Sequence, residues 1–171
     1  IIGAQHAAFY CYDLNRDSLV LWKHSFKEEL LKHIPLAEER FREIRTVMEE
    51  GQPLIITDEN RFRRWRDLLC EKKPSDHPAS QSAILSPLSL GTHKVGLLAL
   101  FGKAGDDCFD EKNDLPPVEQ LSAIIGTAVR NFQLYSEVQD KAKTDGLTSL
   151  LNHSAFYEAL VRETHQAFET K

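Results

Sequence analysis

The chain has 171 residues, which is enough for one full domain and part of a second, with a core that needs no disulfide or metal. Hydrophobic residues make up 42% and charged residues 27%, a balance that excludes a disordered chain. The 21 basic and 26 acidic residues give a net charge of −5, so we expect no nucleic acid as a partner. No apolar run approaches the roughly 18 residues of a membrane span, and the first residues lack the charged-then-apolar pattern of a leader, so we expect neither within this fragment. We therefore expect a cytoplasmic protein without a membrane partner.

The spacing of cysteines and histidines indicates neither a disulfide framework nor a metal site. Cys11, Cys70 and Cys108 are odd in number, far apart and free of CxxC motifs, as is typical of reduced, mostly structural thiols. The seven histidines show no HxxxH or HExxH spacing, so we expect no metal and no haem.

The N-terminal part of the chain predicts a hairpin and two helices. Residues 7–12 and 18–22 are β-prone segments separated by a polar turn. The capping box Ser25-Phe26-Lys27-Glu28 predicts a short helix that ends before Pro35. Apolar residues at spacings of four, three and three predict a second helix over residues 37–50.

The middle of the chain predicts three more strands around a candidate helix. Residues 54–56 form a short apolar run, and residues 82–90 and 94–101 predict a second hairpin with a tight turn. Between them, Phe62, Trp65 and Leu69 share one face if residues 61–69 are helical, and residues 71–80 predict an exposed loop.

A long helix is predicted to begin at Pro116-Pro117, with Asp114 as its cap. Its apolar positions follow the heptad spacing 3-4-3-4-3 and are Val118, Leu121, Ile125, Ala128, Phe132 and Tyr135. A last amphipathic helix, capped by Ser154, is predicted for the tail.

Three stretches carry a resemblance to a known family. Over residues 46–58 a predicted helix runs through Gly51-Gln52-Pro53 into a strand, and residues 82–88 and 95–100 follow the pattern s-x-x-x-x-P-L … x-G-x-L-x-L. With the order of the predicted elements, the chain up to about residue 135 resembles a GAF domain. The resemblance implies an α+β fold: a central antiparallel β-sheet flanked by helices, followed by a long C-terminal helix.

A second resemblance follows the long helix. Residues 144–153, Thr-Asp-Gly-Leu-Thr-Ser-Leu-Leu-Asn-His, resemble the D-x-L-T-G-L-x-N-R opening of a GGDEF domain, the catalytic domain of diguanylate cyclases. Ser149 stands where the family usually has glycine, and His153 stands where it has the arginine that pairs with the aspartate, here Asp145. The family's metal-binding, guanine-binding and glycine-rich signature residues lie further downstream than this chain extends, and it contains no Gly-Gly pair. The resemblance implies a truncated GGDEF stub that is not itself an enzyme.

These resemblances together imply a division of the chain. We expect a GAF domain over residues 1–135, a signalling-helix linker over 136–144 and the N-terminal fragment of a GGDEF domain over 145–171. Because the chain begins with Ile1 rather than methionine, we expect it to be a piece of a longer protein.

The basic stretch around residues 61–66 is the candidate ligand site. Arg64 and Arg66 carry guanidinium forks that match phosphate oxygens, and Phe62 and Trp65 are candidates for the pocket wall. Six basic and four acidic residues are mixed across residues 58–73, which favours the alternative of a solvated helix face. Some GAF domains attach a bilin through a cysteine, but Cys70 has no neighbouring histidine, so we expect no bilin.

The heptad stripe predicts a helix that packs on its own sheet and then pairs with a second copy of the chain. We expect a homodimer whose seam contains Ile125, Phe132, Tyr135 and Val138. Diguanylate cyclases condense two GTP molecules across two facing protomers, so the resemblance implies a sensor that binds an unidentified small ligand, or senses state, and biases the dimer. Two alternatives stay open: a ligand-free dimerisation or protein-interaction scaffold, and the sensor of a catalytically degenerate GGDEF protein.

Overall fold

The computed structural model describes residues 2–72, 82–103, 108–142, 152 and 156. Contacts divide the chain into two compact units, Ile1–Ala128 and Val129–Lys171. Within the described part of the chain, no helix is long and apolar enough to cross a membrane.

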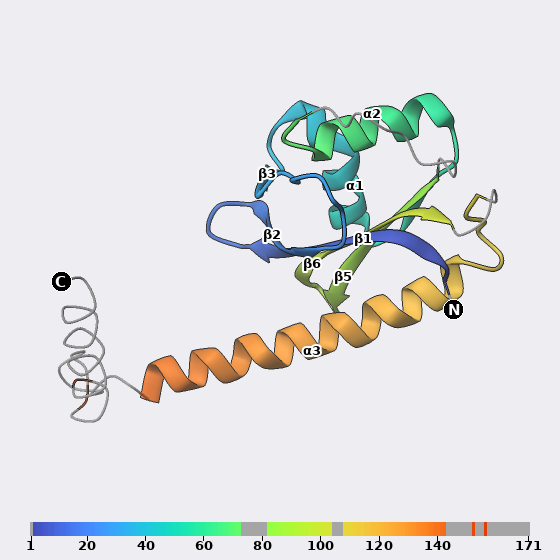
Figure 1. The fold of residues 1–171 in the computed structure, drawn as a ribbon. Coiled ribbons are helices and arrows are strands. Elements are labelled where there is room, and N and C mark those ends of the chain that lie inside the picture. Colours follow the sequence, from blue (N-terminus) through green and yellow to red (C-terminus); the bar gives the residue numbers. More distant parts are fainter. Residues whose placement is uncertain (1, 73–81, 104–107, 143–151, 153–155, 157–171) are drawn as a thin grey trace. The chain divides into compact units, whose positions relative to one another are not determined.

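The first unit is built on a six-stranded sheet in which every neighbouring pair is antiparallel (Figure 1). The strand order is β3-β2-β1-β6-β5-β4. The strands are β1 (Ala4–Asp13), β2 (Ser18–His24), β3 (His33–Pro35), β4 (Leu54–Ile56), β5 (Ala83–Leu90) and β6 (His93–Lys103). Both predicted hairpins are confirmed, as β1 with β2 and β5 with β6, and the short strand at 54–56 is confirmed as β4.

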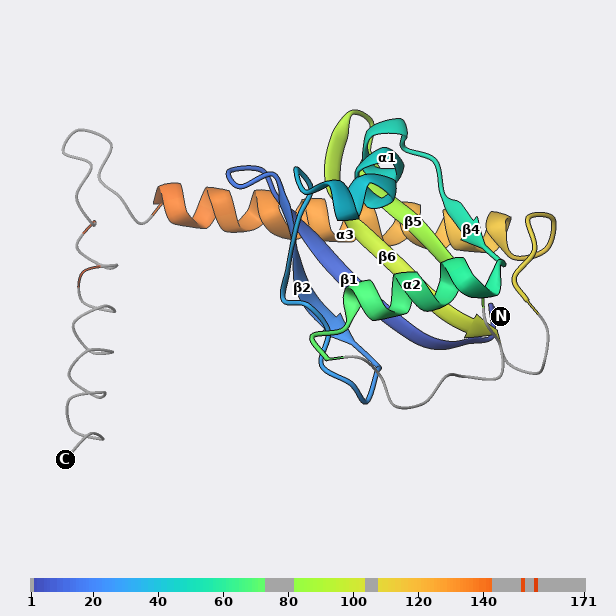
Figure 2. The ribbon, with the colours of Figure 1, turned by 90° about the horizontal axis from the view of Figure 1, so that it is seen from above.

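The helices lie on opposite faces of this sheet (Figures 1 and 2). On one face lie the 3₁₀ turn η1 (Glu39–Phe41), α1 (Arg42–Glu50) and α2 (Glu59–Leu69). On the other face lies the first part of the long helix α3, which runs over Leu115–Ala142.

Local signals set the ends of α1 and α2. α1 ends at Gly51, which adopts a left-handed φ of 68° and donates its N–H to the Val47 carbonyl. Glycine suits that position because it carries no Cβ to clash there. α2 begins after Asp58, whose carboxylate accepts the Arg61 N–H at 2.8 Å. The helix predicted over 37–50 is therefore confirmed, with its first turn replaced by η1.

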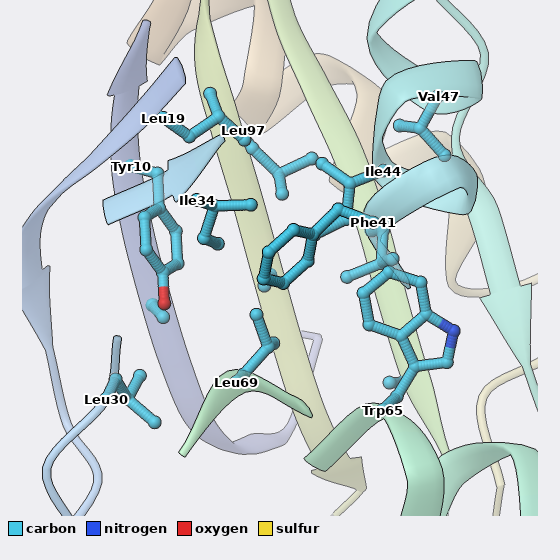
Figure 3. Close-up of a cluster of buried hydrophobic side chains, with 14 of the residues drawn as sticks. Tyr10, Leu19, Leu30, Ile34, Phe41, Ile44, Val47, Trp65, Leu69 and Leu97 are labelled. Carbon is cyan, nitrogen blue, oxygen red and sulfur yellow. The ribbon is translucent and has the colours of Figure 1, made fainter. Parts of the chain in front are cut away.

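The main core fills the space between the sheet and the pair α1 and α2 (Figure 3). Alternate residues of the strands point into it, as do the apolar faces of both helices. Its fully buried side chains include Tyr10, Leu19, Ile34, Phe41, Ile44, Phe62, Leu69 and Leu97.

The first part of α3 packs closely on the other face, against β5. The Ser122 hydroxyl donates to the Ser86 hydroxyl at 2.8 Å, and both residues are buried. A Cβ placed on Gly126 would lie 3.3 Å from the Ser89 carbonyl oxygen, so the absence of a side chain lets the helix approach the strand.

The predicted cap of α3 has a different role. The Asp114 carboxylate accepts the Asp110 N–H and the Lys103 ammonium, both at 2.8 Å. The first turn instead uses the Asp114 carbonyl, which accepts the Val118 N–H at 3.2 Å. Asp114 therefore ties the start of α3 to the end of β6 through its side chain.

The short helix predicted from Ser25 is wrong. Ser25 continues the pairing with β1: its N–H donates to the Ala7 carbonyl and its hydroxyl accepts the Ala7 N–H, both at 2.9 Å. Further on, the Leu31 N–H donates to the Leu69 carbonyl at 2.7 Å, and Leu30 forms a β-bridge with Cys70. The capping side chain and the backbone donors of this segment are thus used by neighbouring elements rather than by a helix.

The second unit contains the remainder of α3, from Val129 to Ala142. Three of its apolar side chains are largely exposed, namely Phe132, Tyr135 and Val138, at 69%, 63% and 64%. Most of the loop predicted at 71–80, the GGDEF-like segment apart from Asn152, and the predicted tail helix apart from Phe156 lie outside the described residues.

Candidate functional site

The two aromatic residues of the candidate pocket wall lie in the core. Phe62 and Trp65 project from α2 toward the sheet, with exposed fractions of 0% and 4%. The Phe62 ring lies 6.1 Å from the Phe101 ring of β6, and Figure 3 shows Trp65 beside Phe41. The predicted face of Phe62, Trp65 and Leu69 is confirmed as the buried face of α2.

Arg66 is also buried, and it is held by an ion pair. Its guanidinium lies 2.6 Å from the Glu28 carboxylate, which belongs to the segment between β2 and β3. The Glu28 backbone N–H donates to the Glu28 carboxylate, and this hydrogen bond holds the pKa of Glu28 below its usual range. Partial burial opposes the shift, and Arg66 lowers the pKa further. The pair therefore joins α2 to the segment that sequence analysis assigned to a helix.

Arg64 is brought together with Trp65, but not with Phe62 or Arg66. It is exposed and faces a surface groove of about 400 Å³ between the start of α1 and α2. The groove is lined by Glu39, Arg40, Arg42, Glu43, Arg61, Arg64, Trp65 and Leu68. Sequence analysis missed Arg40 and Arg42, because they belong to another element and only the folded chain brings them to α2.

The other arginines of α2 have acidic partners. Arg61 lies 3.3 Å from the Glu43 carboxylate, and Arg63 pairs with Glu59 one turn earlier in the helix. Among the residues that the structure describes, Arg64 has no hydrogen bond or ion pair. Three arginines of the basic stretch, Arg61, Arg63 and Arg66, therefore have acidic partners, whereas Arg64 is available to bind a ligand.

The interior beneath α2 holds two titratable groups that burial keeps neutral. Tyr10 is fully buried, and its hydroxyl has no hydrogen-bond partner in the described part of the chain. Burial raises the pKa of the Tyr10 phenol, and nearby Cys70 adds to the shift. Burial also raises the pKa of the Cys70 thiol, so this cysteine stays protonated and is a poor nucleophile near neutral pH.

The predicted seam residues differ in their surroundings along α3. Phe132, Tyr135 and Val138 are exposed, whereas Ile125 is half-buried. Ile124, which sequence analysis did not include in the seam, is 67% exposed. Ile124 also fits the heptad spacing, because it lies three residues after Leu121 and four before Ala128. It therefore belongs to a second possible stripe that shares these two residues with the predicted one.

No protein-family model matches the chain, and no curated protein sequence matches it. Solved structures do match. The GAF domain of a two-component sensor histidine kinase from Bacillus halodurans is 18% identical, with a TM-score of 0.55 over 78% of this chain and 86% of that one. The GAF domain/HD domain protein from Geobacter sulfurreducens is 14% identical, with a TM-score of 0.56 over 79% and 86%.

The fold is GAF-like. The α+β architecture expected from the resemblance is confirmed: an antiparallel sheet with helices on both faces and a long C-terminal helix. A type II free methionine-R-sulfoxide reductase from Thermoplasma acidophilum shares the fold, at 15% identity and a TM-score of 0.53 over 76% of this chain and 82% of that one. At such identities the GAF-like fold is what these matches establish, and proteins of different activity share it.

Proposed function

We propose that this GAF-like chain is the regulatory module of a diguanylate cyclase and acts as a homodimer through α3. The first support is the sequence that follows the helix, residues 144–153, which resembles the opening of a GGDEF domain. The second is the fold, which the chain shares with GAF domains of a sensor histidine kinase and of an HD-domain protein. On this proposal the module works in the cytoplasm, where GTP is available to the cyclase.

The observation that carries the proposal is the exposed apolar surface of α3. Six of its large apolar side chains are exposed: Leu121, Ile124, Phe132, Leu134, Tyr135 and Val138. The spacing of most of them, on a helix with about 3.6 residues per turn, places them on one stripe. A second copy of the helix would cover such a stripe, and a change in helix packing would alter how two cyclase domains face each other.

The packed interior favours the ligand-free form of this module. In many small-molecule sites the ligand occupies a largely preformed cavity. Here Tyr10, Phe41, Phe62 and Trp65 fill the space between the sheet and the helices with buried side chains (Figure 3). This packing supports the scaffold alternative, in which dimer geometry is set without an interior ligand.

Sedimentation of the 171-residue chain tests the dimer. We expect the wild type to sediment as a dimer at micromolar concentration and Phe132→Glu to sediment as a monomer, because two like charges would then face each other in a desolvated seam. Ala123→Glu is the matched control, since Ala123 is exposed on a different face of the same helix. A monomeric wild type, or loss of the dimer in Ala123→Glu alone, would contradict the proposal.

A second measurement addresses the output. Because the chain contains no Gly-Gly pair, we expect it to make no cyclic di-GMP from GTP and Mg²⁺ by itself. Joined to an active cyclase domain, the wild-type module is expected to support a higher rate of synthesis than the Phe132→Glu variant. Equal rates of synthesis would show that dimerisation through α3 does not control the cyclase, and would contradict this part of the proposal.

A further inference from the structure

The surface groove between α1 and α2 carries an inference that goes beyond the proposed function. The groove is lined by side chains of η1, α1 and α2, and it meets the core cluster at Trp65 and Leu68. Its volume of about 400 Å³ falls within the range of about 300–1,000 Å³ that is typical of small-molecule sites.

The groove has an excess of positive charge. Four arginines and two glutamates line it, and Arg40 is paired at 2.6 Å with Glu38, which lies outside the lining, so one positive charge remains in excess. Both carboxylates are already engaged. Glu43 accepts the Trp65 indole N–H and lies 3.3 Å from Arg61, and Glu39 lies within 3.6 Å of Arg42 and 3.5 Å of Arg45.

Two of the arginines are available to a ligand. Arg64 is exposed and has no partner among the described residues. Arg42 pairs with Glu39, but their side chains are 69% and 75% exposed, and such exposed pairs contribute little and exchange easily. Guanidinium groups bind phosphate oxygens through paired hydrogen bonds, so two of them in one groove suit a dianion.

The remaining lining is apolar. Trp65 and Leu68 are the apolar residues of the lining, and the Trp65 indole is fixed by its hydrogen bond to Glu43. A second hollow of about 310 Å³ shares Arg42, Glu43 and Arg61 and extends toward Leu54 of β4. A ligand with an organic part next to its anionic group therefore has both an apolar surface and room.

We propose that this groove binds a small organic phosphate, held by Arg64 and Arg42 with its organic part against Leu68 and the edge of Trp65. The assignment concerns the input to the module and is independent of what lies downstream of α3. Binding is measured directly, so its failure leaves the dimer and cyclase proposals standing, and their failure leaves this one standing.

The two tryptophans allow the site to be located by NMR. Trp65 lines the groove, whereas Trp22 lies on β2 and is 65% exposed. In a titration of the ¹⁵N-labelled chain with adenosine 5′-monophosphate at constant ionic strength, we expect the Trp65 indole resonance to move and that of Trp22 to stay. Inorganic phosphate should move the same resonance with weaker affinity, because it lacks the organic part.

Matched arginine variants then test the assignment. Arg64→Gln and Arg42→Gln are each expected to raise the dissociation constant about tenfold, as is usual for loss of a charge-assisted pair. Arg63→Gln, on the same helix but outside the groove, is the control and should leave affinity within about twofold.

Three results would overturn the proposal. The first is no shift of the Trp65 resonance at millimolar adenosine 5′-monophosphate. The second is an Arg63→Gln loss equal to that of Arg64→Gln, which would indicate general attraction of anions to α2. The third is equal affinity for inorganic phosphate and for adenosine 5′-monophosphate, which would show that the organic part of the ligand makes no contribution to binding.

Discussion

Gly96 lies where β6 passes very close to β1, and its replacement by alanine tests that approach. A Cβ on Gly96 would lie 2.1 Å from the Tyr10 carbonyl oxygen and 3.3 Å from the Cα of Cys11. The carbonyl belongs to a central strand that is paired on both sides, so it cannot turn aside as a flexible side chain would. The strands would have to separate by about 1 Å to reach an ordinary contact distance.

Two costs follow from this separation. Ladder hydrogen bonds beside Gly96 would weaken, and each contributes about 0.5–1.5 kcal/mol. Tyr10 and Leu97, both fully buried, would shift in a close-packed core, and such overpacking costs about 1–3 kcal/mol. We expect Gly96→Ala to lower the free energy of unfolding by about 3–5 kcal/mol, measured by urea titration with circular dichroism.

Gly91→Ala provides the control for this experiment. Gly91 has a φ of 60° in the turn between β5 and β6, and a Cβ there would meet nothing within 4 Å. Its replacement should cost only the left-handed strain of about 1–2 kcal/mol. A Gly96→Ala variant no less stable than Gly91→Ala would refute the close approach of β6 to β1.

Two further predictions concern polar contacts. The pKa of Glu28 is lowered from its ordinary value of 4.5, first by the hydrogen bond from the Glu28 backbone N–H and then by Arg66. These contacts together stabilise the fold above that pH, and the stabilisation is lost as pH falls through the lower folded value. We expect the stability difference between wild type and Glu28→Gln to be full at neutral pH and to shrink in acid; a difference that does not change with pH would contradict this. Ser122→Ala leaves the buried Ser86 hydroxyl without its partner and should cost about 1–3 kcal/mol by urea unfolding, whereas Ser86→Ala/Ser122→Ala should recover part of the loss.

The elements that sequence analysis predicted correctly are those set by local patterns. β-prone segments around short turns gave the two hairpins, and the spacing of Phe62, Trp65 and Leu69 gave the buried face of α2. The prediction of a helix from Ser25 is wrong because the capping residue forms its hydrogen bonds with a residue that is distant in sequence. The Ser25 N–H and hydroxyl pair with Ala7, and no pattern within the segment records that contact.

The orientation of α3 was ambiguous in the sequence for a related reason. Two stripes share Leu121, Ala128 and Tyr135; one passes through Ile125, and the other passes through Ile124. Periodicity does not decide which stripe faces the sheet. Burial shows that neither stripe does so as a whole: the helix buries Val118, Ser122, Gly126 and Val129, whereas the three residues that both stripes share are exposed.

The residues of the candidate groove could not be grouped from the sequence either, because they come from separate elements. Arg64 stood out because basic residues are dense around it, but the pattern grouped it with Arg66, which is buried against Glu28. The groove instead joins Arg64 to Arg40 and Arg42. Those residues come from η1 and α1, and only the packing of α1 beside α2 brings the two sets together.

The position of the groove also constrains how a bound ligand would reach α3. The helices that line the groove and the first part of α3, up to Ala128, lie on opposite faces of the sheet, so an effect has to cross it (Figure 1). β5 offers a direct connection, because α1 packs on one of its faces and the Ser86 hydroxyl holds Ser122 of α3 on the other. A ligand that shifts α1 through Arg42 would therefore act on α3 at a close contact with β5, where Gly126 leaves no side chain to absorb the movement.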